Sequence, residues 1–292
     1  MPGDQFVTRW KPLPEGGRVD GHVFAIADVH GRADLLEAML GRIAGEPTPR
    51  GLRRTLVFTG DLVDRGAEQL RTLRLALAAE EGFDRRVILP GNHEQMMLAA
   101  LRDPEWCGNL QYWYKVGGAA LVEEVAPPRD ASLKEVAAAV RRALPEGFED
   151  LLLRAPSHHA EGPLLFLHAG IAPLGNRQAF LAKGLFEHDR NNLHWAWISD
   201  PFLHWTCGWD RDSQGEPMKG RTVVVHGHTV ECRGKLQDAG DLAAHVDRVD
   251  ELRRISLDIG GVFFGQLAAL EVLDDSYRIH AVTEAPRWLV PE

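Results

Sequence analysis

The sequence has few cysteines and lacks any long apolar run. Only three cysteines occur among 292 residues, at positions 107, 207 and 232, and no two of them are close in the chain. An odd number at this spacing argues against a disulfide framework and against a cysteine-based zinc site. We therefore expect a reducing compartment. No segment reaches the roughly 18 consecutive apolar residues that a membrane helix needs, so we expect no membrane partner.

The sequence also lacks an excess of positive charge. Lys and Arg number 33 and Asp and Glu number 42, which gives a formal net charge of −9. A chain of this sign is not expected to bind nucleic acid through a basic face, although a local arginine or metal site can still hold a phosphorylated substrate. The first residues contain no apolar stretch of signal-peptide length, so we expect a cytoplasmic protein. The sequence does not indicate an oligomeric state.

What the sequence does contain is an alternation of short apolar runs and amphipathic segments. Runs at residues 23–27, 55–59 and 87–89 are each followed by a segment whose apolar residues recur at helical spacing. This order predicts an α/β fold in which helices pack on a parallel sheet. Further runs occur at 164–167 and 222–225, and the tail, residues 255–283, is expected to supply strands that complete a second sheet.

The pattern also predicts the domain organisation. Residues 1–20 are rich in Pro and Gly and are expected to form a loosely tied N-terminal arm. Residues 21–292 are expected to form a single domain. At about 103–160 the alternation stops, and helical stretches near 131–144 and 147–154 predict an insertion that lies over the rim of the sheet.

Polar side chains, most of them potential metal ligands, follow each apolar run. Because the carboxyl ends of parallel strands meet at one edge of a sheet, we expect them to lie together. Any one of these motifs alone is weak, but their joint occurrence at one edge predicts a metal site. Their oxygen and nitrogen donors suit Mn, Fe or Zn. The residues are Asp28, His30, Asp61, Asp64, Arg65, Asn92, His93, His168 and His228.

The ordered motifs DVHG, GDLVDRG, GNHE, HAG and HGHT, which run from residue 28 to residue 229, resemble a known family. This is the phosphoprotein phosphatase family of dinuclear, calcineurin-like metallophosphoesterases, which includes Ser/Thr protein phosphatases and bacterial symmetrical diadenosine tetraphosphatases. The resemblance covers about residues 22–275. It implies a central β-sandwich of two mixed sheets flanked by helices, with the metal site at the carboxyl ends of the strands.

The resemblance implies a set of metal ligands. Two divalent ions are expected, with Mn as the first expectation and Fe or Zn as alternatives. A hydroxide that bridges the two ions would attack phosphorus in line. Asp28 and His30 would bind the first ion and Asp61 would bridge both. The second ion would be completed by Asn92, His168 and His228.

The same resemblance implies the residues that act on the phosphate. Arg65 would hold phosphate oxygens together with Asn92 and His93. His93 would protonate the leaving oxygen as general acid, and Asp64 would orient His93. The family often supplies a second phosphate-binding arginine, for which Arg211 and Arg221 are the candidates in this chain.

These motifs leave the substrate open. The first hypothesis is a Ser/Thr-type protein phosphatase acting on phosphorylated proteins, which the sequence WISDP at 197–201 favours. The alternative is symmetrical hydrolysis of a nucleotide polyphosphate such as diadenosine tetraphosphate. A non-catalytic phosphate-binding scaffold is the remote third hypothesis, since all the expected ligands and the general acid are present.

Overall fold

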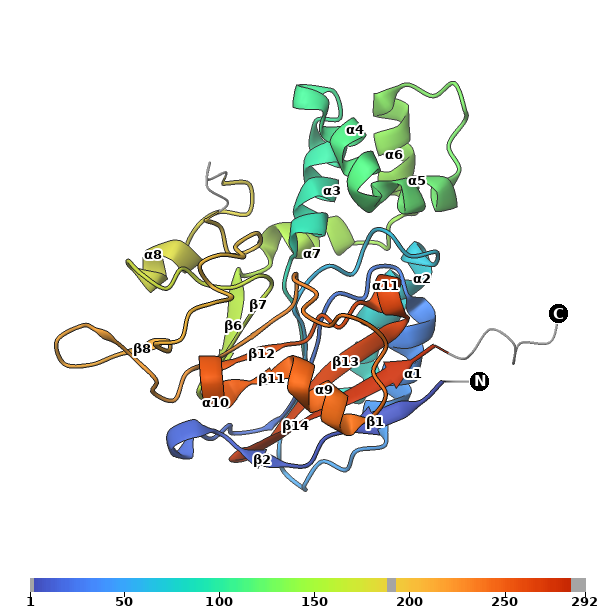
Figure 1. The fold of residues 1–292 in the computed structure, drawn as a ribbon. Helices are drawn as coiled ribbons and strands as arrows, with labels where there is room; N and C mark the ends of the chain where they lie inside the picture. Colours follow the sequence, from blue (N-terminus) through green and yellow to red (C-terminus); the bar gives the residue numbers. More distant parts are fainter. Residues whose placement is uncertain (1–2, 188–192, 285–292) are drawn as a thin grey trace.

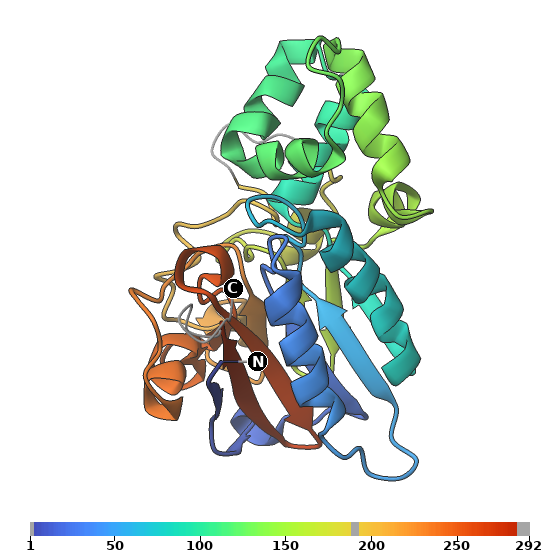
Figure 2. The same cartoon turned by 90° about the vertical axis from the view of Figure 1, so that its right-hand side faces the viewer.

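Two β-sheets packed face to face form the centre of the protein (Figures 1 and 2). The computed structural model describes residues 3–187 and 193–284. In the larger sheet the strand order is β1-β14-β13-β3-β4-β5, and β2 also pairs with β14. Its strands are β1 (Gln5–Val7), β2 (Lys11–Pro12), β3 (His22–Ile26), β4 (Arg54–Phe58), β5 (Arg85–Ile88), β13 (Gln266–Leu273) and β14 (Ser276–Thr283).

The smaller sheet has the order β11-β12-β10-β7-β6, and a separate hairpin joins β8 to β9. Both sheets are mixed, as the resemblance implies. In the larger sheet β3, β4 and β5 run parallel, while β13 runs antiparallel to β3. In the smaller sheet β7 runs parallel to β10 but antiparallel to β6. The strands are β6 (His158–Glu161), β7 (Leu164–Leu167), β8 (Asp210–Arg211), β9 (Pro217–Met218), β10 (Val223–His226), β11 (Asp247–Arg248) and β12 (Arg254–Ser256).

Two helices, α1 and α2, cover the outer face of the larger sheet, and further helices form a lobe at one end (Figure 2). The α-helices are α1 (Ala33–Ala44), α2 (Gln69–Ala78), α3 (Asn92–Arg102), α4 (Asn109–Trp113), α5 (Ala119–Val125), α6 (Leu133–Ala143), α7 (Phe148–Arg154), α8 (Arg177–Leu181), α9 (Ala239–Val246), α10 (Val249–Leu252) and α11 (Gly261–Phe264). Short helical turns are η1 (Pro14–Gly16), η2 (Ala79–Gly82), η3 (Trp106–Gly108) and η4 (Tyr114–Gly118). Within the described part of the chain, no helix combines the length and apolar character needed to cross a bilayer; the cytoplasmic location stays a prediction.

The apolar run of strand β3 packs against a different layer of the fold on each of its two faces. All five of its residues are buried. Because side chains alternate along a strand, Val23 and Ala25 pack between the two sheets, whereas Phe24 and Ile26 pack under the helices. A strand buried on both faces reads as a continuous apolar run, as is usual for parallel sheets covered by helices.

The parallel strands end at the same level. Ile26 of β3 pairs with Phe58 of β4, and Phe58 pairs with Ile88 of β5. The loops that follow these three strands therefore start side by side. This register brings the polar motifs after each strand to one edge of the sheet.

Of two expectations for the chain ends, one is wrong and the other is confirmed only in part. The N-terminal segment is not loosely tied, because β1 and β2 both pair with β14 at the edge of the larger sheet. The tail does not go only to the second sheet either, since β12 joins the smaller sheet while β13 and β14 join the larger one. The long pairing of β13 with β3 places the tail next to the first apolar run.

The interruption at 103–160 is helical. Its predicted helical stretches coincide with α6 and α7. Helix α3 leads from the end of β5 into the lobe and packs against α4 and α6 (Figure 1). The lobe therefore stands at the edge of the sheet where the polar motifs gather.

Candidate metal centre

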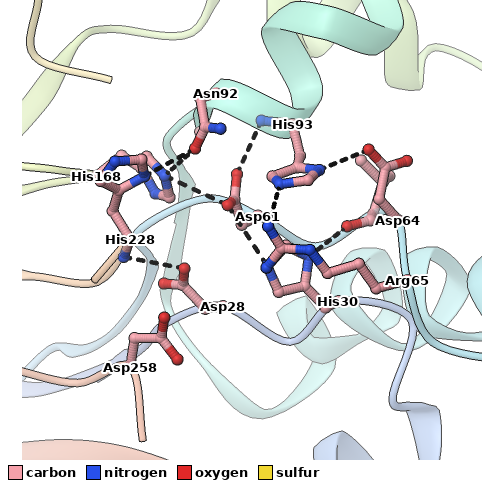
Figure 3. Close-up of polar contacts among 12 residues, drawn as sticks. Asp28, His30, Asp61, Asp64, Arg65, Asn92, His93, His168, His228 and Asp258 are labelled. Atoms are coloured by element: carbon pink, nitrogen blue, oxygen red, sulfur yellow. Dashed lines mark hydrogen bonds and ion pairs between the residues drawn. The ribbon is translucent and has the colours of Figure 1, made fainter. Parts of the chain in front are cut away.

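The structure brings together all nine residues that the sequence predicted for the site, and a tenth that it did not predict (Figure 3). Each lies just beyond the carboxyl end of a strand. The contributing strands, with their residues, are β3 (Asp28, His30), β4 (Asp61, Asp64, Arg65), β5 (Asn92, His93), β7 (His168), β10 (His228) and β12 (Asp258).

Asp61 lies at the centre of this arrangement. Its Oδ2 atom is 3.5 Å from Nε2 of His30 and 3.4 Å from Nε2 of His168. Two groups of potential metal ligands share this carboxylate, and within each group the ligand atoms lie within 4.8 Å of one another. The first group is His30, Asp61 and His93. The second is Asp61, His168 and His228. One carboxylate shared by two groups is the arrangement that a pair of adjacent cations requires.

Backbone carbonyls fix the orientation of two imidazoles. Nδ1 of His30 lies 2.7 Å from the carbonyl oxygen of Val63, and Nδ1 of His168 lies 3.0 Å from that of Thr59. In each ring the Nδ1–H group donates to that carbonyl oxygen, which directs Nε2 at Asp61. Both Nε2 atoms thereby face the carboxylate at the centre of the site, where a cation could bind them.

Asn92, His228 and Asp28 complete the second side. Oδ1 of Asn92 lies 2.9 Å from Nε2 of His168 and 2.9 Å from Nδ1 of His228. The backbone N–H of His228 donates to Oδ2 of Asp28 at 2.9 Å. The other oxygen, Oδ1, is buried and has no hydrogen-bond partner among the described residues. A buried carboxylate oxygen without a partner costs free energy unless a cation compensates it, so these residues fit a bound metal.

The backbone of the site is strained. Six of the eleven described non-glycine residues with positive φ belong to it: Asp28, His30, Asp61, Asp64, Arg65 and His228. Such conformations cost roughly 1–3 kcal/mol each and persist only where the surrounding structure enforces them. The strain is concentrated in the loops that turn these side chains toward the centre.

Burial sets the charge state of the site. It raises the pKa of Asp28 well above its usual value, and it raises the pKa of Asp258 to about 6. It lowers the pKa of His30 and of His228 to about 3, so both imidazoles are neutral at pH 7. Burial alone would also raise the pKa of Asp61, but the nearby imidazoles, led by His168, hold it well below its usual value. Burial alone would lower the pKa of His168, but the Asp61 carboxylate raises it above its ordinary value. Imidazole nitrogens among crowded carboxylates form a donor set for divalent cations.

A second set of contacts lies beside His93. Nδ1 of His93 is 2.6 Å from Oδ2 of Asp64, and the indole N–H of Trp113 donates to both oxygens of Asp64 at 2.9 Å. Nη2 of Arg65 lies 2.8 Å from Nε2 of His93, and its Nη1 lies 2.9 Å from Nε2 of His30. The Arg65 guanidinium therefore points into the space between the two imidazoles.

Sequence reasoning missed three residues. Asp258 follows a strand end like the predicted ligands, and its place in the run ISLDIGG was the signal that could have revealed it. Glu94 is buried and accepts the backbone N–H groups of Asp61, Leu62 and Gly91, so it holds the ligand loops in place. Trp113 comes from the insertion, and no spacing in the sequence relates it to Asp64.

The two candidates for a second phosphate-binding arginine do not join the site. Arg211 lies on β8 and donates to the carbonyl oxygen of Pro173. Arg221 precedes β10, at the end of that strand opposite to His228. Arg65 is thus the arginine that the structure places against the predicted ligands.

One further group of potential ligands lies away from this edge. Glu46, Glu271 and His280 approach within 4.8 Å of one another. Arg278 forms ion pairs with both carboxylates of this group. A cation is therefore already present there in the form of an arginine.

Comparisons with known proteins agree with this geometry. The family model for calcineurin-like phosphoesterases matches residues 21–245. A bis(5'-nucleosyl)-tetraphosphatase PrpE (asymmetrical) of Bacillus subtilis strain 168 is 31% identical over 258 residues, which cover 83% of this chain and 87% of that protein. A symmetrical bis(5'-nucleosyl)-tetraphosphatase of Pseudomonas syringae pv. tomato is 26% identical over 280 residues, covering 91% of this chain and 83% of that protein.

A shorter match reaches a protein phosphatase. Serine/threonine-protein phosphatase 2 of Salmonella typhimurium is 34% identical over 96 residues, 32% of this chain and 40% of that protein. Among solved structures, a Saccharomyces cerevisiae protein serine/threonine phosphatase with similarity to human phosphatase PP5 aligns with a TM-score of 0.46 at 15% identity, covering 94% of this chain and 82% of that chain.

Proposed function

This chain belongs to the calcineurin-like phosphoesterase family, and from that premise we propose that it hydrolyses dinucleoside polyphosphates such as diadenosine tetraphosphate. The observation that carries the phosphoester chemistry is the pair of ligand groups that share Asp61. The nucleotide substrate is supported by relatives that align over more than four-fifths of the chain and are named as bis(5'-nucleosyl)-tetraphosphatases.

The residues that would hold two divalent ions, with Mn²⁺ as the first expectation, are Asp28, His30, Asp61, Asn92, His168 and His228. Two such ions, when bound, lower the pKa of water and stabilise negative charge on phosphate oxygens. The protein contributes the neutral state of His30 and His228 and the fixed orientation of Nε2 in His30 and His168.

Arg65, His93 and Asp64 would act on the phosphate itself. The Arg65 guanidinium points between His30 and His93, where its N–H groups can donate to phosphate oxygens. Asp64 accepts a hydrogen bond from Nδ1–H of His93, which leaves Nε2 to deliver a proton to the leaving oxygen. Asp64 thus fixes the orientation of the His93 ring.

The second candidate function is Ser/Thr-type protein dephosphorylation. It is favoured by the 34% identity to a serine/threonine-protein phosphatase over 96 residues and by the WISDP sequence. The preference for a phosphoprotein that the sequence suggested is not confirmed. We place the nucleotide first because the relatives named for it cover far more of the chain.

One parallel assay separates the two substrates. Metal-stripped protein is reloaded with Mn²⁺ and given diadenosine tetraphosphate and a phosphothreonine peptide at equal concentration. We expect preferential cleavage of the nucleotide, and the products tell the two modes apart, since symmetrical cleavage gives two ADP and asymmetrical cleavage gives ATP and AMP. Fast release of phosphate from the peptide, with the nucleotide intact, would reverse the proposal.

The chemistry is tested by two substitutions. Asp61→Asn weakens the shared ligand and His93→Asn removes the general acid, and each is expected to lower turnover by roughly 100-fold or more. Asp130→Asn, at an exposed position of the insertion, is the matched control and should leave turnover unchanged. Wild-type rates in Asp61→Asn and His93→Asn, with folding confirmed by circular dichroism, would defeat the mechanism.

A further inference from the structure

A cavity of about 600 Å³ opens beside the metal centre, and it is lined by α3, by the start of the insertion and by Phe186, Glu187, His194 and Trp197. We propose that this cavity binds one nucleobase of the substrate and thereby selects nucleotides over other phosphoesters. The inference rests on the proposed function and adds to it the place where the base is recognised. The volume lies within the range of about 300–1,000 Å³ that small-molecule pockets occupy.

Helix α3 connects the cavity to the metal centre. Asn92 stands at its first turn, and Gln95, Met96 and Ala99 follow at the spacings of three, four and seven residues that put side chains on one helix face. At a rise of 1.5 Å per residue, Ala99 lies roughly 10 Å along the axis from Asn92. A substrate whose phosphate lies at Asn92 can therefore extend along this face into the cavity.

Trp197 also lies between the cavity and the metal centre, next to His228. Its ring centroid is 6.4 Å from that of His228, and its indole N–H donates to the side-chain oxygen of Gln95. Gln95 in turn donates to the carbonyl oxygen of Leu185. The ring of Trp197 is thus held in one orientation at the junction between the metal centre and the cavity.

The remaining aromatic rings suit a flat ligand. Trp106 and Tyr112, on the insertion, are 58% and 54% exposed, and Phe186 lines the cavity with Trp197. Aromatic side chains that group around a cavity are typical of ligand-binding pockets. Aromatic faces stack on any nucleobase.

The charge of the cavity favours a base over a further phosphate. Arg102 lines it together with Asp103 and Glu187, and the Arg102 guanidinium lies 5.8 Å from the ring centroid of Phe186. One cation beside two carboxylates provides no net attraction for an anion. The cavity therefore suits the uncharged part of a nucleotide, while the metal centre and Arg65 take the phosphates.

The test uses the two exposed rings. Trp106→Ala and Tyr112→Ala are compared with Tyr114→Ala, an exposed ring of the same insertion that does not line the cavity. In Mn²⁺-loaded protein, we expect each of the first two variants to lower kcat/KM for diadenosine tetraphosphate about tenfold, while hydrolysis of p-nitrophenyl phosphate, which has no base, stays within twofold. Binding of AMP, measured by calorimetry, should weaken by a similar factor. Tyr114→Ala should behave like the wild type.

The outcomes separate this inference from the proposed function. If the wild type does not cleave diadenosine tetraphosphate, the proposed function fails, whereas the AMP titration still reports on the cavity. Equal AMP affinity in the wild type, Trp106→Ala and Tyr112→Ala would overturn the base site. An equal loss on p-nitrophenyl phosphate would assign these rings to the structure of the insertion, and a loss confined to a phosphothreonine peptide would assign the cavity to a peptide side chain.

Discussion

At the scale of single residues, Trp113 ties the helical insertion to the pair formed by His93 and Asp64. Trp113 is fully buried, and a Cβ atom added to Gly118 would lie 2.3 Å from its ring. The backbone N–H of Arg65 also donates to the carbonyl oxygen of Gly117, at 3.0 Å. The insertion thus packs directly on the residues proposed to act on the phosphate, and Trp113 is a positioning residue for them.

Trp113→Phe keeps a ring and removes the N–H that donates to Asp64. We expect kcat to fall about three- to tenfold and the pH profile of kcat to shift, because Asp64 loses two hydrogen bonds that favour its ionised form. Trp195→Phe makes the same change at a buried tryptophan whose N–H donates to the carbonyl oxygen of Lys183. Both variants should lose stability, but only Trp113→Phe should change the pH profile of kcat. A profile of Trp113→Phe identical to that of the wild type would show that Trp113 only packs in the core.

Gly227 offers a sharper test at the same scale. A Cβ atom at this position would lie 1.8 Å from Oδ1 of Asp28, the oxygen that lacks a partner. Gly227→Ala should therefore displace Asp28 and reduce the bound metal, measured by elemental analysis, as well as activity. Gly41→Ala is the control, because the new methyl group in α1 meets no atom within 4 Å and should be neutral or slightly stabilising. A full metal content in Gly227→Ala would contradict the role of Asp28.

At the scale of elements, the strands could be predicted and their wider connections could not. The buried run of β3 and the polar residues after it are local features, so the sequence located Asp28 and His30 correctly beside the later motifs. The pairing of β13 with β3, by contrast, joins residues more than 240 positions apart, and the run that became β13 is compatible with either sheet. The contact between Trp113 and Asp64 depends on the packing of a whole lobe, for which no local spacing provides a pattern.

The ionic cluster around β13 gives a prediction about pH. Glu271 is buried, yet hydrogen bonds from His22, His280 and Arg278 hold its pKa well below the usual value. A carboxyl whose pKa is lowered on folding stabilises the fold fully above its ordinary pKa of about 4.5, and this contribution declines as the pH falls from there toward the lower pKa of the folded state. Wild-type stability should therefore decrease in acid.

Glu271→Gln should cost about 3–5 kcal/mol at pH 7, since it leaves buried partners without their counter-charge. The difference from the wild type should shrink at pH 4, as measured by urea unfolding at both values. Glu149→Gln removes a more exposed ion pair with Arg141 and should cost less than about 1 kcal/mol at either pH. A constant difference between wild type and Glu271→Gln would show that the charge of Glu271 does not contribute.

At the scale of the whole molecule, the metal centre joins both sheets. Asp28, Asp61 and Asn92 follow strands of the larger sheet, whereas His168, His228 and Asp258 follow strands of the smaller one. A cation held between them would connect the two layers at one end. The stability of the fold and the occupancy of the site are then linked, because a ligand that binds only the folded state stabilises it.

Removal of metal should therefore lower the melting temperature of the whole protein. Without a cation, the buried carboxylates of Asp28, Asp61 and Asp258 raise one another's free energy, and Oδ1 of Asp28 stays without a partner. At a hundred times its Kd, Mn²⁺ would contribute about 2.7 kcal/mol, which corresponds to roughly 5 °C for a chain of this size. Calorimetry of chelator-treated protein, before and after Mn²⁺ is restored, measures this shift.

Asp61→Asn serves as the control: its melting temperature should respond little to Mn²⁺, since the ligand shared by both groups is weakened. An equal response in Asp61→Asn and wild type would place the stabilising ion elsewhere in the molecule.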